Sequence, residues 1–201
     1  MGNFGSRAGP KARLELGTLE DRCTPAVLWN VGAASDKVAS FVVNDGAAQR
    51  SMVNSIQINF NQQVNLNESG GQLHLLRSTA DAWVEVPFTN AQVTTNQDGN
   101  TWVRYVGPSS SDAIIIDGDY KIVLTASRYS ADNEVVGSLH SLYGDVNGDR
   151  TVDQADYEAF RSALGTNASQ RNYAWYLDVN HDSSINIVDY VAFRANLGTS
   201  V

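Results

Sequence analysis

The chain has 201 residues, of which 42% are hydrophobic and 18% charged, so it can bury a core and does not have the composition of a disordered protein. Its formal net charge of −8 makes nucleic acid and anionic membrane surfaces poor partners, and no apolar run is long enough for a transmembrane helix. Cys23 is the one cysteine, which excludes an internal disulfide framework, so packing or a metal has to stabilise the fold.

The first 25 residues are predicted to be a flexible or sorting segment. The basic residues Arg7, Lys11 and Arg13 are not followed by an apolar stretch, so a secretory signal of standard form is absent. The sequence LELGTLEDRCTPA, residues 14–26, resembles a short LExLEDRxxPA-like motif near the N-terminus of many exported planctomycete proteins. The resemblance implies export or attachment to the cell surface, and the alternative is an ordinary amphipathic segment.

Residues 26–140 are predicted to form β-strands. Apolar and polar residues alternate in SIQINF, QLHLL and WVEV, as in strands with one buried face. The stretch AQVTTNQDGNTWVRYV predicts a hairpin with Asp98-Gly99 in its turn. IDGDYKIVLTA predicts a further strand with Tyr120, Ile122 and Leu124 on one face. Turns rich in Asn, Gly and Asp between these strands favour a β-sandwich.

Tyr120 starts a strand just after a turn, which is the position of a tyrosine corner, whose hydroxyl bonds the backbone upstream. The segments QINFNQQVNL, NTWVRYV, DGDYKIVLTAS and ADNEVVG, within residues 55–137, resemble bacterial Ig-like domains. The resemblance implies a sandwich and no particular chemistry. Most of the three residues Trp83, Trp102 and Tyr105 are predicted to pack in the core, and the alternative is an aromatic platform for a sugar.

The last third of the chain contains an internal repeat. GDVNGDRTVDQADYEAFRSALGT and LDVNHDSSINIVDYVAFRANLGT align without gaps from Asp145 and Asp178 onward, at a period of 33 residues. Twelve of the 22 positions through Thr166 and Thr199 are identical. Each copy begins like an EF-hand loop, whose ligands come from loop positions 1, 3, 5, 7, 9 and 12.

These positions hold oxygen-bearing residues in both copies, and Ca²⁺ takes six to eight oxygen ligands. Position 7 contributes its backbone carbonyl, and position 9 often acts through a water. The predicted ligands of two Ca²⁺ ions are Asp145, Asn147, Asp149, Thr151, Asp153 and Asp156 in the first loop, and Asp178, Asn180, Asp182, Ser184, Asn186 and Asp189 in the second.

Two positions depart from the common EF-hand. Position 12 is Asp rather than Glu, and position 6 is Arg150 or Ser183 where Gly usually allows the sharp turn. A left-handed conformation there costs a non-Gly residue about 1–2 kcal/mol, so we expect weak binding, with a Kd of about 10⁻⁴ to 10⁻³ M. At position 8, Val152 and Ile185 are expected to join the two loops back to back through a short backbone bridge.

A helix is predicted after each loop, because apolar residues recur at i, i+3 and i+7. A glycine follows each predicted helix where a C-terminal cap belongs. No helix precedes the first loop, and VVGSLHSLY predicts a strand that runs straight into it. The helical residues are Tyr157, Phe160 and Leu164 with Gly165, and Tyr190, Phe193 and Leu197 with Gly198.

A loop and exiting helix used twice, without an entering helix, resemble the dockerin domain over residues 144–200. This resemblance implies two bound calcium ions and docking onto cohesin domains, which often attaches polysaccharide-degrading enzymes to a scaffold. Dockerins often carry Ser-Thr at loop positions 10 and 11. Here these positions are Gln154-Ala155 and Ile187-Val188, so the usual partner recognition is not carried over.

The alternative to a metal site is a pair of solvated Asp-rich turns. Four aspartates in the first loop and three in the second are costly to pack together unless a cation lies between them. We therefore expect the C-terminal third to be poorly ordered without calcium.

Catalytic motifs such as HExxH, GxSxG and the Walker pattern are absent from the sequence. His74 and His140 are predicted to be plain sheet residues, and His181, at loop position 4, to point away from the metal. Paired carboxylates for glycoside hydrolysis remain an alternative, but nothing in the sequence singles out a pair. We therefore expect a non-enzymatic protein.

The predicted fold is mainly β with a small α-helical C-terminal module: an Ig-like sandwich at 26–140 and a dockerin-like pair of loop–helix motifs at 141–201. The predicted protein is exported to the cell surface or medium. It binds Ca²⁺ and interacts with a cohesin-like or other surface protein, without nucleic acid or membrane insertion. The alternative function is an accessory role in polysaccharide degradation, by binding glycan or by docking beside a glycoside hydrolase.

Overall fold

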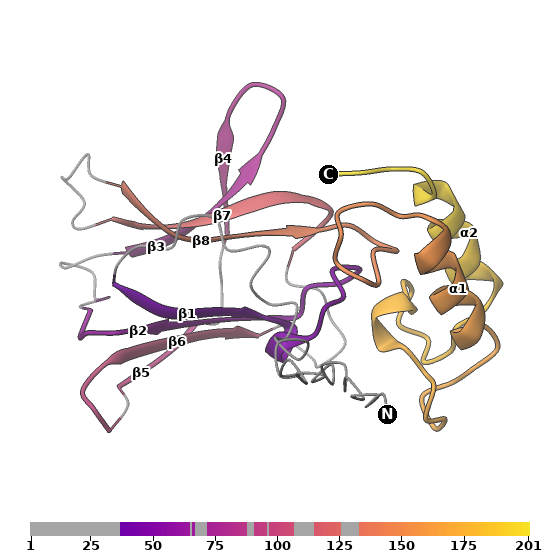
Figure 1. The fold of residues 1–201 in the computed structure, drawn as a ribbon, viewed down its shortest axis with the longest axis horizontal. Coiled ribbons are helices and arrows are strands. Elements are labelled where there is room, and N and C mark those ends of the chain that lie inside the picture. Colours follow the sequence, from indigo (N-terminus) through magenta and orange to yellow (C-terminus); the bar gives the residue numbers. More distant parts are fainter. Residues whose placement is uncertain are drawn as a thin grey trace, which may run out of the picture.

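The computed structural model describes residues 37–64, 66, 72–87, 91–95, 97–106, 115–125 and 133–201. The N-terminal sorting-like segment and its LELGTLEDRCTPA motif lie outside these residues. The described strands form two four-stranded antiparallel sheets that lie face to face (Figure 1). The chain is thus mainly β, with two helices near its C-terminal end.

The first sheet has the order β1-β2-β6-β5. Its strands are β1 (Val38–Val43), β2 (Ser55–Phe60), β6 (Thr101–Val106) and β5 (Ala91–Thr95). The 3-10 turn η3 (Asn44–Gly46) follows β1. β5 and β6 pair antiparallel with Thr95 opposite Thr101, and Gly99 in the connecting turn has a φ of +81°. This confirms the predicted hairpin.

The second sheet has the order β4-β3-β7-β8. Its strands are β4 (Trp83–Val86), β3 (Gln72–Ser78), β7 (Gly118–Thr125) and β8 (Asn133–Ser141). The Tyr120 hydroxyl donates to the Ile116 carbonyl oxygen at 2.8 Å, as expected of a tyrosine corner. This bond fixes the start of β7, where the chain has crossed from the first sheet to the second.

The sandwich core lies between the sheets and is built by the predicted alternation. Ile56, Ile58 and Phe60 of β2 are buried, and so are Tyr120, Ile122 and Leu124 of β7, as predicted. The prediction is wrong for Val84, which is half exposed because β4 is a short edge strand that extends beyond the sandwich core (Figure 1).

The helical module, residues 142–201, lies at one end of the sandwich (Figure 1). It contains α1 (Gln154–Ala163), the 3-10 turn η4 (Trp175–Leu177) and α2 (Ile187–Asn196). β8 runs directly into it, as predicted. The module has its own hydrophobic core, separate from that of the sandwich, which includes Val152, Phe160, Leu177, Ile185 and Phe193.

A segment between η3 and β2, residues 47–54, packs the sandwich against the module, and we refer to it as the docking segment. The Arg50 amide donates to the Asp145 carbonyl oxygen at 2.8 Å, and the Leu142 amide donates to the Arg50 carbonyl oxygen at 2.9 Å. Met52 adds its side chain to the core of the module. The first loop of the repeat is therefore held against the sandwich by backbone bonds.

A second contact joins Asp117, the residue before β7, to the module. The Asp117 carboxylate accepts the Tyr143 amide at 2.8 Å and the Asn196 side-chain amide at 3.2 Å. Burial raises the pKa of Asp117, an effect that these two hydrogen bonds oppose. No helix in the described residues is both long enough and apolar enough to cross a membrane.

Candidate calcium site

The two predicted loops have the same backbone turns. Positions 4 and 6 are left-handed in both: Gly148 and Arg150 have φ values of +79° and +75°, and His181 and Ser183 have +56° and +67°. These conformations favour glycine, yet three of the four positions carry a side chain. The sharp turn expected at position 6 is thus present without glycine, and the exposed side chain of His181 points into solvent.

The aspartate at position 1 anchors each loop from within. Asp145 and Asp178 are both buried. Asp145 accepts the Gly148 amide at 2.6 Å on Oδ1 and the Arg150 amide at 3.0 Å on Oδ2. Asp178 accepts the Ser183 amide at 2.8 Å on Oδ2. The loop backbone wraps around these carboxylates.

Positions 9 and 12 couple each loop to the helix that follows it. Asp153 and Asn186 are the N-cap residues of α1 and α2, and each accepts an amide hydrogen from the first helical turn. Asp156 and Asp189 return the bond, because they accept the Asp153 amide at 2.9 Å and the Asn186 amide at 2.8 Å. Each capping box therefore consists of two predicted ligands.

The position-12 aspartates also reach across the loop to its start. The Val146 amide donates to Asp156 at 2.8 Å, and the Val179 amide donates to Asp189 at 2.8 Å. Both carboxylates are fully buried. The shorter Asp side chain thus suits a loop that is already closed tightly on itself.

Positions 3 and 5 form the exposed rim of each loop, and position 7 beside them is partly buried. The Asn147 side-chain amide donates to Asp149 at 2.8 Å, and its counterpart Asn180 donates to Asp182 at 3.0 Å. The bond from Asn180 is the main cause of a lowered pKa at Asp182. The amides of the position-7 residues, Thr151 and Ser184, donate to the same aspartates. The structure thus brings all twelve predicted residues into two equivalent loops.

The residues present suit a hard cation such as Ca²⁺, because every candidate ligand is an oxygen. Burial raises the pKa of Asp156, and the nearby charge of Asp145 acts in the same direction, because two carboxylates of like charge lie close together. In the part of the chain that the structure describes, no three acidic, histidine or cysteine side chains converge as a cluster. An EF-hand-type loop does not need one, because Asn side chains and a carbonyl supply other ligands.

Two side chains from outside the loops contact the position-1 aspartates. His140 Nε2 lies 2.7 Å from Asp145 Oδ2, and the Tyr173 hydroxyl donates to Asp178 Oδ2 at 2.6 Å. His140 does lie in a strand, as predicted, but its ring faces the first loop. Extending the 33-residue period five positions upstream of each loop would have paired these two residues.

The prediction for position 8 is wrong. Val152 and Ile185 do not bridge to one another. The Gly198 amide donates to the Val152 carbonyl oxygen at 2.8 Å, and the Gly165 amide donates to the Ile185 carbonyl oxygen at 2.8 Å. Each loop is therefore joined to the end of the other repeat's helix, where the left-handed glycine cap turns the backbone toward it.

The two helices pack through Phe160 and Phe193, which are fully buried with ring centroids 4.7 Å apart. Leu164 and Leu197 were predicted to continue the same faces. They are instead 45% and 47% exposed, because each helix ends one residue earlier. The last member of the apolar period therefore lies outside the core in both helices, and Leu164 lines a groove.

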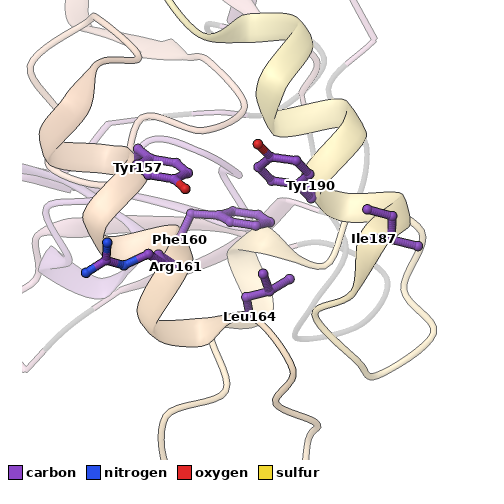
Figure 2. Close-up of a pocket in the computed structure, with 6 residues that line it drawn as sticks. All are labelled: Tyr157, Phe160, Arg161, Leu164, Ile187 and Tyr190. Atoms are coloured by element: carbon purple, nitrogen blue, oxygen red, sulfur yellow. The ribbon is translucent and has the colours of Figure 1, made fainter.

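This groove runs between α1 and α2 and has a volume of about 310 Å³. Tyr157, Phe160 and Leu164 line it from α1, and Ile187 and Tyr190 line it from α2, with the Arg161 side chain at its edge (Figure 2). The surface beside it on α2 is apolar, since Ile187, Val188 and Val191 are 67%, 50% and 63% exposed.

The three aromatic residues considered for sugar binding do not form one platform. The prediction that most of them pack in the core is wrong, because Tyr105 is buried there whereas Trp102 points outward from the same strand of the first sheet. Trp83 lies in the second sheet, is 45% exposed, and has the Lys121 ammonium 4.2 Å from its ring centroid.

The solved structures compared with the chain are only distantly similar to it. No curated protein matches the chain. Two solved structures with some similarity to the chain are mutants of a type II Cohesin-X-Dockerin complex from Acetivibrio cellulolyticus. One is altered at the N-terminal interface and the other at the C-terminal interface. Each is 14% identical. They cover 67% and 70% of this chain and 85% and 91% of their own, with TM-scores of 0.27 and 0.28, too low to indicate a shared fold.

The family comparison is specific to the C-terminal part of the chain. Residues 143–197 match the family model described as the dockerin type I domain, which spans both loops and both helices. Modules of this family are non-catalytic, typically bind calcium and mediate protein–protein interaction with cohesins. Over these residues the chain is thus similar to the dockerin type I domain.

Proposed function

We propose that residues 141–201 bind two Ca²⁺ ions and that the calcium-bound module attaches an exported protein to a cohesin-like partner. The observation that carries the proposal is the matching hydrogen-bond pattern of two loops inside one dockerin type I match. Calcium would neutralise the loop carboxylates and link the loop to the helix that follows it. The sandwich, proposed as a separate domain at 26–140, would then be the part that is attached.

The ligand assignment follows the loop positions. The first ion would be held by Asp145, Asn147, Asp149, Thr151, Asp153 and Asp156, and the second by Asp178, Asn180, Asp182, Ser184, Asn186 and Asp189. Titration calorimetry of the full chain should give two bound ions. Asp156→Ala and Asp189→Ala should each remove one ion, because each takes away a buried ligand that also caps a helix.

Asp81→Asn is the matched control, since Asp81 is an exposed aspartate far from the loops, and it should leave both ions bound. The same proteins should gain helical circular dichroism and melting temperature when calcium replaces a chelator. A wild-type chain with no bound ion, or with helix signal and melting temperature independent of calcium, would refute the calcium assignment.

We infer that the partner docks on the α2 side of the module. At three equivalent positions, the first repeat has Gln154, Ala155 and Glu158, and the second has Ile187, Val188 and Val191. The apolar set is well exposed and adjoins the groove between the helices. Exposed contiguous apolar surface is typical of an interaction site. The two loops of the module are therefore alike, whereas the exposed surface is apolar on α2 and not on α1.

Exchanging residues between equivalent positions of the two repeats tests whether the partner binds the apolar surface of α2. Val191→Glu gives α2 the residue that α1 has, and should weaken binding to a cohesin domain by at least tenfold, because a charge would enter an apolar contact. Glu158→Val, the reverse exchange on α1, should leave binding unchanged. Surface plasmon resonance against immobilised type I cohesin domains, with calcium and with chelator, measures both. Equal loss in the two variants would contradict an α2 interface.

The N-terminal resemblance to exported proteins and the dockerin match both support an extracellular or cell-surface location, with a signal of non-standard form. The strand orders β1-β2-β6-β5 and β4-β3-β7-β8 support an Ig-like sandwich, because they correspond to the A-B-E-D and C′-C-F-G sheets of that fold, with the tyrosine corner at strand F. Docking beside a polysaccharide-degrading enzyme is compatible with the module. No arrangement of the described aromatic residues favours glycan binding by the sandwich.

A further inference from the structure

In each loop, the Oδ2 atom of the position-1 aspartate accepts a hydrogen bond from the side chain of the residue five positions upstream. In the first loop that residue is His140, and in the second it is Tyr173. The two are separated by 33 residues, the period of the repeat, so they occupy equivalent positions. The repeat thus preserves a hydrogen bond to Oδ2 while the residue that makes it has changed from one copy to the other.

Each position-1 carboxylate accepts one hydrogen bond from the upstream side chain and one from the position-6 amide. Oδ2 of Asp145 faces His140 and accepts the Arg150 amide, and Oδ2 of Asp178 faces Tyr173 and accepts the Ser183 amide. With Oδ2 engaged on two sides, the carboxylate cannot rotate, and Oδ1 stays turned toward the loop. A ligand whose orientation is fixed in advance loses less entropy when it binds a metal.

The surroundings of His140 indicate that its ring serves the loop. The ring is fully buried, and Nδ1 has no hydrogen-bond partner among the described residues. Its one described side-chain hydrogen bond is therefore the bond to Asp145. A carboxylate only accepts hydrogen bonds, so the ring nitrogen that faces it, Nε2, carries the proton.

The two donors come from different parts of the protein. His140 belongs to β8, where it is paired with Asp119 of β7, so the sheet fixes its position. Tyr173 lies just before η4, inside the helical module. The first loop is therefore oriented by the sandwich and the second by the module itself.

We propose that His140 and Tyr173 are positioning residues of the two calcium loops, each orienting the position-1 aspartate of its own loop. This inference rests on the proposed calcium binding. It adds residues that lie outside the loops, and it makes the first loop dependent on the sandwich.

Tyr173→Phe is the most conservative test, because it removes only the hydroxyl. In titration calorimetry of the full chain, calcium affinity should fall by about tenfold at one of the two sites and stay unchanged at the other. The rise in melting temperature from chelator to saturating calcium should be roughly 2–4 °C smaller than in the wild type. Tyr120→Phe is the matched control, since it also removes a buried hydroxyl bond but lies in the sandwich.

His140 is tested by a pair of variants. His140→Leu removes the donor, whereas His140→Gln returns an N–H at a similar distance from the backbone. His140→Leu should lose about tenfold in calcium affinity at the site that Tyr173→Phe leaves unchanged. His140→Gln should recover most of that loss. Combining Tyr173→Phe with His140→Leu should weaken both sites, since each acts on its own loop.

A purely structural role gives a different result. Tyr173→Phe would then lower the melting temperature equally with chelator and with calcium, as expected of Tyr120→Phe, and both affinities would be unchanged. That result, with two ions still bound by the wild type, would overturn the inference and leave the proposed function intact. A wild-type chain that binds no calcium would overturn both.

Discussion

Position 6 of each loop holds a side chain where the backbone favours glycine. Ser183 has a φ of +67°, and only its amide, which donates to Asp178, is used in the loop. Ser183→Gly should relieve about 1–2 kcal/mol of strain and lose about 0.4–1 kcal/mol to the freer unfolded chain. The net gain of about 0.5–1 kcal/mol should raise the melting temperature by roughly 1–4 °C.

The control for this prediction is Ser169→Gly. Ser169 is an exposed serine that does not have a positive φ, so glycine relieves no strain there and should lower the melting temperature slightly. Thermal melts with chelator compare the two variants without any effect of calcium. If both changes lower the melting temperature, the left-handed conformation at position 6 is not a source of strain.

Arg150, at position 6 of the first loop, has a compensation that Ser183 lacks. Its guanidinium donates to Asp119 of β7 at 2.7 Å and to the Val201 carbonyl oxygen at 3.3 Å. A partly exposed ion pair contributes at most about 1 kcal/mol, which is similar to the strain at this position. The side chain therefore offsets its own backbone cost by joining the first loop to the sandwich.

Single residues were predictable where local geometry alone decides their role. The turn at position 6, the glycine caps and the Tyr120 hydroxyl bond all depend on neighbours within a few residues. His140 was missed because alternation along a strand shows which side a residue faces and not what lies there. Its contact with Asp145 exists because β8 ends directly at the loop.

At the level of elements, the strands and helices were predictable and their ends were not. The alternation in β2 and β7 and the helical period around Phe160 and Phe193 correspond to buried faces. Leu164 and Leu197 satisfy the same period, but the glycine that follows each of them ends the helix first. Apolar residues at helical spacing lie on one buried face only as long as the backbone stays helical.

The joining of the two repeats also depends on these helix ends. Each loop accepts a hydrogen bond from the glycine cap of the other repeat. The two repeats are therefore joined loop to helix end and not loop to loop. This arrangement has a consequence for folding: neither loop can be complete unless the helix of the other copy has formed. Two ions bound by one module should therefore stabilise a single cooperative unit.

At the level of the whole molecule, the contact between the sandwich and the module was invisible in the sequence. The docking segment, residues 47–54, contains no motif and no repeat. Its Arg50 is nonetheless buried, with its guanidinium donating to the carbonyls of the three residues before it. Burial lowers the pKa of Arg50, and the nearby Asp145 charge opposes this effect. The backbone bonds of Arg50 with Leu142 and Asp145 join residues that are far apart in the chain, where no local pattern records them.

Gly148 provides a test of this contact. A β-carbon there would lie 2.3 Å from the Ala48 carbonyl oxygen of the docking segment, whereas a β-carbon on Gly165 would meet nothing within 4 Å. The two glycines have similar φ values, +79° and +85°, so alanine costs about 1–2 kcal/mol of backbone strain at either site. Gly148→Ala should cost about 1–3 kcal/mol more, because backbone of the docking segment has to move.

Differential scanning calorimetry with chelator should therefore find Gly148→Ala less stable than Gly165→Ala, by roughly 2–10 °C in the melting temperature of the module. The loss of the contact should also separate the unfolding of the module from that of the sandwich, since each has its own hydrophobic core. Equal melting temperatures for the two variants would mean that the docking segment moves aside at no cost. The docking segment would then not hold the first loop in place, and the contacts of His140, Asp117 and Asp119 would be the remaining links between the two parts.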